Sequence, residues 1–533
     1  MFEWVFVAGI FVAFYNAWGG GANDCANSFA TSVGSGVLTL KKALLIASVF
    51  EFSGAVLMGS HVTDMVRKQI VSIDAFEDNP GVLMIGMLCA DLSSAIWLTI
   101  ATYFQWPVST THSIIGAIVG FSLAYKGNDA VSWDKIGLVV ASWVISPLLA
   151  GVFSSIFFFT INTLVFSRDD PVKRIITLIP ILVFFTFLIN TLFIIYKGSP
   201  QLELDETPLG ISLAASAGIS LFTALIARYV YVPYVKKQLQ LENENTGPHT
   251  EHPDNIQVEV RTASYKEATG NDDVPAMTLT DVDLGSSTTT DNDMYDGIQP
   301  VDRTKSVEEN ILQLETNTKL LKDKKKSHEI SVFHENAQNI DPKADELCSW
   351  VQIITACFSS FAHGSNDVAN AVAPLATIYH IYRKDTIAES ASVPIWVLVL
   401  GGAGIVFGLA TWGYKIIERM GKQITKISPS RGFIVEMASA LTVIIASRAE
   451  LPVSTTHCQV GSIVGCGLIG GRNNVKWSLL HKILMSWLVT LPVTGLISAG
   501  LFSFAYFSPN ELNENIYDGN GSYYNISNFT EMC

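Results

Sequence analysis

Two short polar phrases each occur twice in this sequence, and their spacing constrains the fold more than any other feature. Pro-Val-Ser-Thr-Thr-His fills positions 107–112 and again 452–457. Gly-Ala-Asn-Asp-Cys-Ala-Asn fills 21–27, and Gly-Ser-Asn-Asp-Val-Ala-Asn fills 364–370. The two offsets, 345 and 343 residues, are nearly equal. This agreement indicates an internal duplication, so the fold has to contain two equivalent halves with one copy of each phrase.

Apolar runs of about 20 residues, the length that crosses a bilayer as a helix, fill most of the sequence between these phrases. The chain is 49% hydrophobic and only 15% charged, with a mean hydropathy of +0.34, which excludes an ordinary soluble protein. We predict an all-α polytopic membrane protein with about twelve passes, five in each half and two between the halves. The expected spans outside the polar phrases are Phe2–Trp18, Ala43–Val62, Gly81–Phe104, Ile136–Phe166, Ile175–Tyr196, Gly210–Val235, Val393–Tyr414 and Trp477–Phe507.

Charges in the short loops indicate that the two halves have opposite orientations. Lys415–Arg431 and Arg472–Lys482 are basic, which is typical of cytoplasmic loops. Their counterparts in the first half, His61–Pro80 and Lys126–Lys135, are acidic or neutral and are expected outside. The first half has five expected passes and the linking pair adds two. Because seven is odd, the second half enters the membrane from the opposite face, which gives the same inverted orientation. We therefore predict inverted-topology repeats with broken or re-entrant helices at the doubled phrases.

The remaining polar segments lie between and after these halves. Val235–Leu347 holds 12 Lys/Arg against 23 Asp/Glu, so the net charge of −14 describes mainly one loop, and no nucleic-acid partner is expected. The tail carries three glycosylation sequons, at Asn520, Asn525 and Asn528, which places it outside the cell. The predicted regions are 1–166 (first transmembrane repeat), 167–234 (linking transmembrane helix pair), 235–347 (cytoplasmic, mostly disordered acidic loop), 348–508 (second, inverted repeat) and 509–533 (extracellular tail). Both termini are expected to be extracellular.

The Pro-Val-Ser-Thr-Thr phrases predict an anion site. A proline followed by hydroxyl residues interrupts an apolar run and starts a new helix, whose first N–H groups have no intrahelical partner. Such helix ends carry a partial positive charge and bind anions. Broken helices at matched places of two inverted halves point to a substrate site at the membrane midplane. The candidate anion ligands are Ser109, Thr110, Thr111, Ser454, Thr455 and Thr456.

The Asn-Asp phrases predict the opposite kind of site, because their oxygens suit a small cation. The candidate ligands are Asn23, Asp24, Asn27, Asn366, Asp367 and Asn370. Further acids lie in the apolar segments, namely Glu51 and the pair Asp91 and Glu436, each of which precedes its Ser-Thr-Thr phrase by 18 residues. Intramembrane carboxylates mark ion paths. Since no Lys or Arg lies in the phrases, an anion could enter only with cations, which predicts symport.

These four motifs, in this order, resemble the inorganic phosphate transporter (PiT) family, in particular its eukaryotic sodium–phosphate cotransporters. The resemblance covers 1–234 and 348–508. It implies an inverted-repeat membrane protein, usually a homodimer, that carries inorganic phosphate with sodium at the plasma membrane. It further implies sodium at Asp24 and Asp367 with their flanking asparagines, phosphate at the two Ser-Thr-Thr phrases, and a requirement for Glu51 and Glu436. Asp91 has no dependable family counterpart.

Alternatives remain open at the level of the sequence. A proton-coupled phosphate or sulfate symporter would use the same architecture and motifs. An intramembrane hydrolase is disfavoured because the sequence contains neither His-Glu-x-x-His nor Gly-x-Ser-x-Gly. His112 and His457 are expected to stabilise or gate the helices rather than to act as bases, and no enzymatic activity or cofactor is expected. A passive channel gives no reason for doubled carboxylates.

Overall fold

The computed structural model describes residues 3–24, 26–70, 73–77, 79–196, 204, 207–237, 340–387, 393–448, 453–508, 516–517 and 523–524. The described chain is helical except for one antiparallel pair of two-residue strands near its end, β1 (Ile516–Tyr517) and β2 (Tyr523–Tyr524). The sequons at Asn520, Asn525 and Asn528 lie outside the described residues, as does most of the predicted acidic loop. Predictions about those segments stay predictions.

The α-helices of the first half and the linking pair are α1 (Glu3–Asn23), α2 (Ala26–Gly34), α3 (Leu40–Ile70), α4 (Pro80–Tyr103), α5 (Thr110–Lys126), α6 (Trp133–Ile161), α7 (Pro171–Ile195) and α8 (Leu209–Ile226). Those of the second half are α12 (Pro342–Glu346), α13 (Ser349–Lys384), α14 (Ile395–Trp412), α15 (Tyr414–Gln423), α16 (Pro429–Arg448), α17 (Thr455–Ile469) and α18 (Trp477–Phe507). Short 3-10 or π turns are η1 (Ile73–Phe76), η2 (Gly127–Ala130), η3 (Asn162–Phe166), η5 (Ala227–Tyr231) and η6 (Arg472–Asn474).

The chain divides into two compact units. One combines Met1–Val232 with Phe333–Cys533 and contains the helical bundle, and the other is Pro233–Val332. Helix α12 belongs to the first unit, because it packs against α7 and α16. The predicted boundary at Leu347 follows this helix, and the division of the chain into regions stays a prediction. The first turn of α12 is capped by Asp341, whose side chain accepts a hydrogen bond from the Ala344 amide at 2.9 Å.

Nine helical stretches in the described residues are long and apolar enough to cross a membrane. Helices α5 and α17 are shorter, with 17 and 15 residues, because each starts at a Ser-Thr-Thr phrase inside the bundle. Helix α13 has 36 residues but carries the second Asn-Asp phrase and is polar in consequence. The fold class is confirmed, while the count of twelve passes stays a prediction.

The two halves are related as inverted repeats. In order and in motif content, α1 and α2 together correspond to α13, while α4, α5 and α6 correspond to α16, α17 and α18. Helix α1 packs directly against its counterpart α13 in the antiparallel direction: the Phe6 ring stacks on Tyr382 with centroids 4.8 Å apart, and ten residues later Asn16 Nδ2 lies 3.4 Å from the Asn370 carbonyl oxygen. Equivalent helices therefore run in opposite directions, as the loop charges predict.

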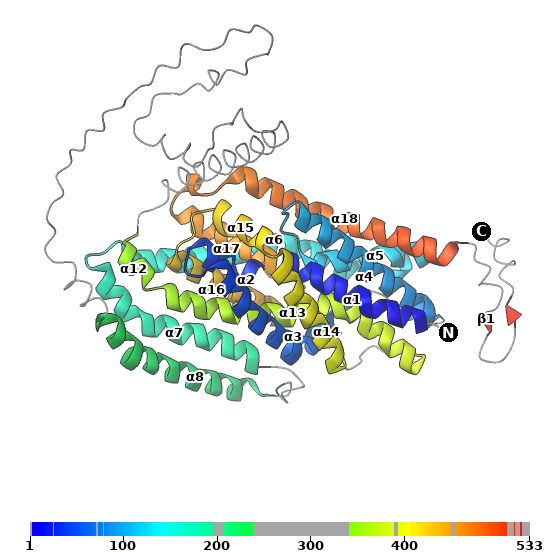
Figure 1. Cartoon of the computed structure of the whole chain (residues 1–533), viewed down its shortest axis with the longest axis horizontal. Helices are drawn as coiled ribbons and strands as arrows, with labels where there is room; N and C mark the ends of the chain where they lie inside the picture. Colours follow the sequence, from blue (N-terminus) through cyan, green and yellow to red (C-terminus); the bar gives the residue numbers. More distant parts are fainter. Residues whose placement is uncertain are drawn as a thin grey trace, which may run out of the picture. The chain divides into compact units, whose positions relative to one another are not determined.

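Each repeat packs its helices against those of the other repeat (Figure 1). Helix α1 lies along α14 and α3 along α13, while α5 lies along α18 and α6 along α17. Glycine permits the closest contacts: a Cβ on Gly21 would lie 1.9 Å from the Ile405 carbonyl oxygen, and one on Gly364 would lie 2.2 Å from that of Glu51. These contacts bring the Asn-Asp phrase of each half against the backbone of the other half.

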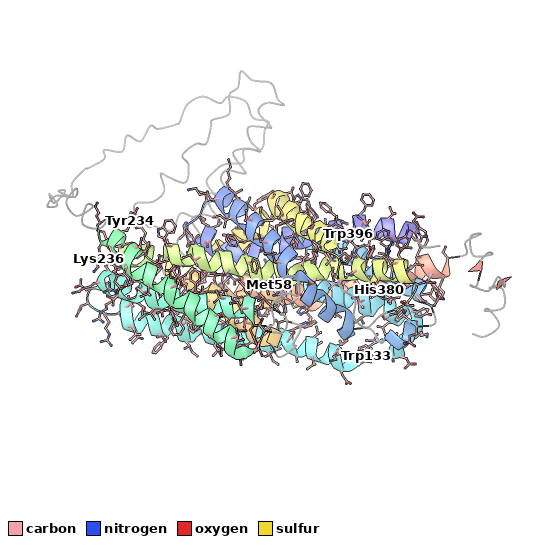
Figure 2. All side chains as sticks on the ribbon, turned by 90° about the horizontal axis from the view of Figure 1, so that it is seen from below. Met58, Trp133, Tyr234, Lys236, His380 and Trp396 are labelled. Carbon is pink, nitrogen blue, oxygen red and sulfur yellow. The ribbon has the colours of Figure 1, made fainter. Side chains whose placement is uncertain are left out.

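Large apolar side chains cover the rim of the bundle, as lipid contact requires. Figure 2 shows Trp133 and Trp396 at opposite edges, and both are exposed, whereas Met58 is buried. Exposed aromatic residues near helix ends are typical of membrane–water interfaces. The strongly exposed Phe11, Phe222 and other apolar side chains are therefore expected to face lipid rather than water.

Candidate functional site

The Ser-Thr-Thr phrases start helices in both halves, as predicted. Ser109 is the N-cap of α5 and accepts a hydrogen bond from the His112 amide at 3.2 Å. Ser454 caps α17 in the same way and accepts from the His457 amide at 3.3 Å. Pro107 stands two residues before its cap rather than in the first helical turn. The serines therefore satisfy the helix ends, which leaves the threonine hydroxyls facing the interior.

The two Asn-Asp phrases differ in backbone. The first interrupts the helix, since α1 ends at Asn23 and α2 begins at Ala26, whereas α13 continues through the second phrase without interruption. Asn23 explains the break: its Oδ1 accepts from the Val108 amide at 2.9 Å, and its Nδ2 donates to the Trp106 carbonyl at 2.9 Å. Asn23 therefore ties the end of α1 to the segment before α5, and both polar atoms of its amide are engaged in this conformation.

The carboxylate of Asp24 is fully buried, with 1% exposure, and accepts hydrogen bonds from both Ser-Thr-Thr phrases. Thr110 Oγ1 donates to Asp24 Oδ2 at 2.9 Å, and Thr456 Oγ1 donates to Oδ1. Asn27 Nδ2 donates to the same Oδ1 and lies 3.0 Å from Thr456 Oγ1. The hydroxyls predicted to hold an anion thus contact the carboxylate predicted to hold a cation.

The second carboxylate, that of Asp367, lies on the other side of Thr110. Its Oδ2 is 3.3 Å from Thr110 Oγ1, and Asn370 Nδ2 approaches the same hydroxyl at 3.0 Å and the Thr111 hydroxyl at 3.1 Å. A threonine hydroxyl has one proton to donate and cannot satisfy both carboxylates. The two acids therefore compete for the Thr110 proton, and a cation between them would stabilise both charges.

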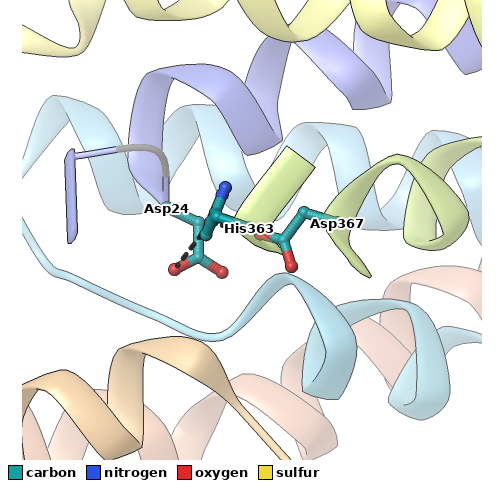
Figure 3. Close-up of side chains that lie close together, drawn as sticks. All are labelled: Asp24, His363 and Asp367. Atoms are coloured by element: carbon teal, nitrogen blue, oxygen red, sulfur yellow. Dashed lines mark ion pairs between the residues drawn. The ribbon is translucent and has the colours of Figure 1, made fainter. Parts of the chain in front are cut away.

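His363 connects three carboxylates at the centre (Figure 3). Its Nε2 lies 2.7 Å from Asp367 Oδ2 and 3.8 Å from Asp24 Oδ1, while its Nδ1 lies 2.9 Å from Glu51 Oε2. Ser360 Oγ donates to Glu51 Oε1 at 2.9 Å. One atom each from Asp24, His363 and Asp367 lie within 4.8 Å of one another, close enough to ligate one metal ion.

The other two acids lie away from this centre, on opposite sides. Glu436 on α16 accepts hydrogen bonds from Thr31, Thr355 and, at 3.3 Å, Ser32. Asp91 on α4 accepts one from Asn16 Nδ2 at 2.5 Å. Both carboxylates are 1% exposed.

The remaining candidates line a small cavity next to the centre. It has about 30 Å³ of space accessible to a water molecule. Asn27, Asn366, Thr455 and His363 contribute to its wall, together with residues of α7 and α16. Thr455 Oγ1 also lies 3.5 Å from Asp24 Oδ1. A space of this size holds about one or two waters and is too small for an oxyanion with its ions.

Sequence reasoning missed His363, Asn16 and the hydroxyls around Glu51 and Glu436. One signal was present for His363, because it precedes Asp367 by four residues and a helix places such a pair on one face. The first repeat offered no matching residue, since Gly20 stands at the equivalent position. The Asn16 contact has no local signal, because its partner lies on another helix.

His112 and His457 form a pair where α5 and α17 begin. Their rings are buried with centroids 4.7 Å apart, and the His457 ring stacks on Trp487 at 3.7 Å. Among the described residues, no side-chain nitrogen of either histidine has a hydrogen-bond partner. Neither ring contacts a serine or threonine hydroxyl in a nucleophile–base arrangement, which agrees with a structural role for the pair.

Comparison with known proteins assigns this architecture. A model of the phosphate transporter family matches residues 20–498. The chain belongs to the phosphate transporter family. Sodium-dependent phosphate transporter 1 of Mus musculus is 31% identical, over 94% of this chain and 95% of the relative. Sodium-dependent phosphate transporter 1-A of Danio rerio is 32% identical, over 95% of each. A solved structure described as the sodium-dependent phosphate transporter covers 95% of this chain and 100% of its own, with a TM-score of 0.70 and 28% identity.

The match to the phosphate transporter family includes both copies of both phrases and confirms the resemblance seen in the sequence. It also confirms a multi-pass membrane transporter architecture rather than that of an enzyme family. The sequons follow the matched residues, so the family match says nothing about the tail.

Proposed function

We propose that this protein carries inorganic phosphate across a membrane together with sodium, by alternating access between its two inverted repeats. One observation carries the proposal. Hydroxyls from both Ser-Thr-Thr phrases and carboxylates from both Asn-Asp phrases meet in a single buried cluster around Thr110 and Asp24. Anion and cation sites in direct contact couple the two substrates, because each neutralises the other.

Electrostatics requires the cations. Asp24, Asp367 and Glu51 lie around His363, and among the described ion pairs of this cluster His363 is the sole basic partner. A phosphate ion entering beside these carboxylates would be repelled by several kcal/mol even at an effective dielectric of about 20. Each helix N-terminus offers only about half a positive charge. Sodium ions bound with the phosphate supply the missing charge.

We assign sodium to Asp24, Asp367 and the flanking Asn27, Asn366 and Asn370, with Asn23 as a further ligand once its present hydrogen bonds open. Phosphate takes the hydroxyls of Ser109, Thr110, Thr111, Ser454, Thr455 and Thr456 and the amides at the starts of α5 and α17. In this structure Thr110 and Thr456 donate to Asp24. Sodium at Asp24 would release these hydroxyls toward phosphate, which makes sodium binding a precondition for tight phosphate binding.

The names of the relatives support sodium over protons as the coupling ion and phosphate over sulfate as the anion. We further infer, from the resemblance and the tail sequons, a homodimer in the plasma membrane with both termini outside. No cofactor is needed for this reaction, since the driving force is the sodium gradient.

Uptake of labelled phosphate into proteoliposomes tests the function. An inward sodium gradient should drive accumulation above equilibrium, whereas choline in place of sodium should not. A pH gradient without sodium should be ineffective as well. Uptake driven by pH alone would replace sodium with protons, and phosphate equilibration without any gradient requirement would contradict symport.

A further inference from the structure

A buried polar cluster outside the centre has no role in the proposed function. Asp91 on α4 and Asn16 on α1 are 1% and 2% exposed, and Asn16 Nδ2 lies 2.5 Å from Asp91 Oδ1. The same Nδ2 lies 3.4 Å from the backbone carbonyl oxygen of Asn370 on α13. Two helices, α4 and α13, therefore bring oxygen atoms to one amide group on a third, α1.

The sequence of α13 directs the Asn370 carbonyl toward this cluster. In a helix this oxygen would accept a hydrogen bond from the amide four residues later, but that residue is Pro374, which has no N–H. A carbonyl released in this way inside a membrane helix is a typical cation ligand. The side chain of Asn370 points to the centre instead, where it contacts Thr110 and Thr111.

Two further observations point to a cation as the ligand of this cluster. Among the described residues, Asn16 Oδ1 is buried and has no hydrogen-bond partner. No ion pair of the described residues includes Asp91. A buried carboxylate without a cation is costly, and so is a buried amide oxygen without a donor. Rotation of the Asn16 amide about its terminal bond would exchange Nδ2 for Oδ1 beside Asp91, and one cation would then satisfy both groups.

The inverted repeat gives this cluster a counterpart. Asp91 on α4 corresponds to Glu436 on α16, which is surrounded by the hydroxyls of Thr31, Ser32 and Thr355. Asn16 precedes Asp24 by eight residues on α1, and Thr355 precedes Asp367 by twelve on α13. Asn370, whose carbonyl contacts Asn16, follows Asp367 by three residues, so the two positions lie on opposite sides of Asp367 along α13. Because α1 and α13 are antiparallel, the two acids flank the centre on opposite sides.

We propose that Asp91, Asn16 Oδ1 and the Asn370 carbonyl form a further sodium site, on the side of the centre opposite Glu436. The inference rests on the proposed sodium-coupled function. Sodium fits better than a proton, because a proton on Asp91 could bond the Asn16 oxygen but would leave the Asn370 carbonyl, which Pro374 deprives of its helical donor, without a partner, whereas one sodium ion can be ligated by all three oxygens. Occupation of this site would act on phosphate binding through Asn370, whose carbonyl would hold the ion while its side chain contacts the hydroxyls of Thr110 and Thr111.

Sodium binding and transport together test the site. Equilibrium binding of radioactive sodium to the purified full-length protein, without phosphate, should show one fewer ion per protomer in Asp91→Asn and in Asn16→Leu. The ratio of sodium to phosphate, measured from the reversal potential in proteoliposomes, should fall by one in both variants. Asp134→Asn removes an exposed acid at the start of α6 and should change neither quantity.

The outcomes separate this inference from the proposed function. An unchanged sodium count and ratio in Asp91→Asn would overturn the site, as would a wild-type protein whose Asp91 responds to pH but not to sodium. If neither variant folds, thallium soaked into the wild-type protein should give an anomalous scattering peak between Asp91 and Asn16, and its absence there would also overturn the site. A wild-type protein that binds no sodium at all would instead contradict the proposed function.

Discussion

Replacing Asp24 by asparagine tests the centre most directly. The carboxylate is buried, accepts hydrogen bonds from Thr110 and Thr456, and lies 3.8 Å from His363 Nε2. Asp24→Asn keeps the size of the side chain and one acceptor oxygen but removes one negative charge. The change should therefore act on sodium binding while the helices around it stay packed.

The size of the effect follows from Coulomb's law. A sodium ion held by a carboxylate loses about 4 kcal/mol when a unit charge about 4 Å away disappears, at an effective dielectric near 20. Since about 1.4 kcal/mol corresponds to a factor of ten in affinity, we expect sodium affinity to fall roughly a thousandfold. Sodium-driven phosphate uptake would then be undetectable at physiological sodium.

Two measurements distinguish this from damage to the fold. Asp24→Asn should melt at the same or a higher temperature than the wild type in sodium-free buffer, because it removes repulsion among Asp24, Asp367 and Glu51. It should also lose the stabilisation that sodium gives the wild-type protein. Asp134→Asn provides a matched control for the loss of an exposed charge. Asp24→Asn with a sodium half-saturation within tenfold of wild type and normal uptake would refute the reasoning.

Three further predictions address packing, topology and coupling. Gly408→Ala places a Cβ 1.9 Å from the Trp18 carbonyl oxygen and should lower the free energy of unfolding by about 1–3 kcal/mol. Gly137→Ala, whose Cβ meets nothing within 4 Å, should raise it by up to about 1 kcal/mol. Chemical denaturation in detergent compares the two variants. An endoglycosidase should shift the mobility of the protein through the tail sequons, and an epitope near Thr289 should stain only after permeabilisation of the cell; a tail tag hidden in intact cells would contradict this topology. Phosphate affinity of the purified protein should rise with sodium, and sodium affinity should rise with phosphate by the same factor, so tight phosphate binding in sodium-free buffer would contradict coupling.

The inverted repeat could be predicted because the signals that indicate it lie within short segments of the sequence. Doubled phrases, loop charges and the lengths of apolar runs depend on short segments, and the bilayer limits a chain of this composition to helices. The caps at Ser109 and Ser454 also follow from local sequence, since a capping serine acts on the amide three residues later. Asp24 and Asp367 could also be proposed from the sequence alone, because each lies in one copy of the doubled Asn-Asp phrase.

What the sequence could not determine is which of these residues meet. The doubled phrases predict an anion site and a cation site separately, whereas the folded chain places Thr110 between Asp24 and Asp367. The difference arises because each helix packs against the opposite repeat, so contacts cross hundreds of residues and leave no local pattern.

The sequence by itself thus determined the membrane class, the duplication and its inversion, and the residue types of the site, because helix length, charge and capping act over a few residues. Only the tertiary structure determined three contacts. Asn23 accepts a hydrogen bond from the segment before α5, His363 lies between Asp367 and Glu51, and Asn16 donates a hydrogen bond to Asp91. These contacts depend on the crossing of helices at glycines such as Gly21 and Gly364, where backbones approach more closely than any other residue would allow. Close packing between distant segments is a property of the whole bundle, and no single stretch of sequence encodes it.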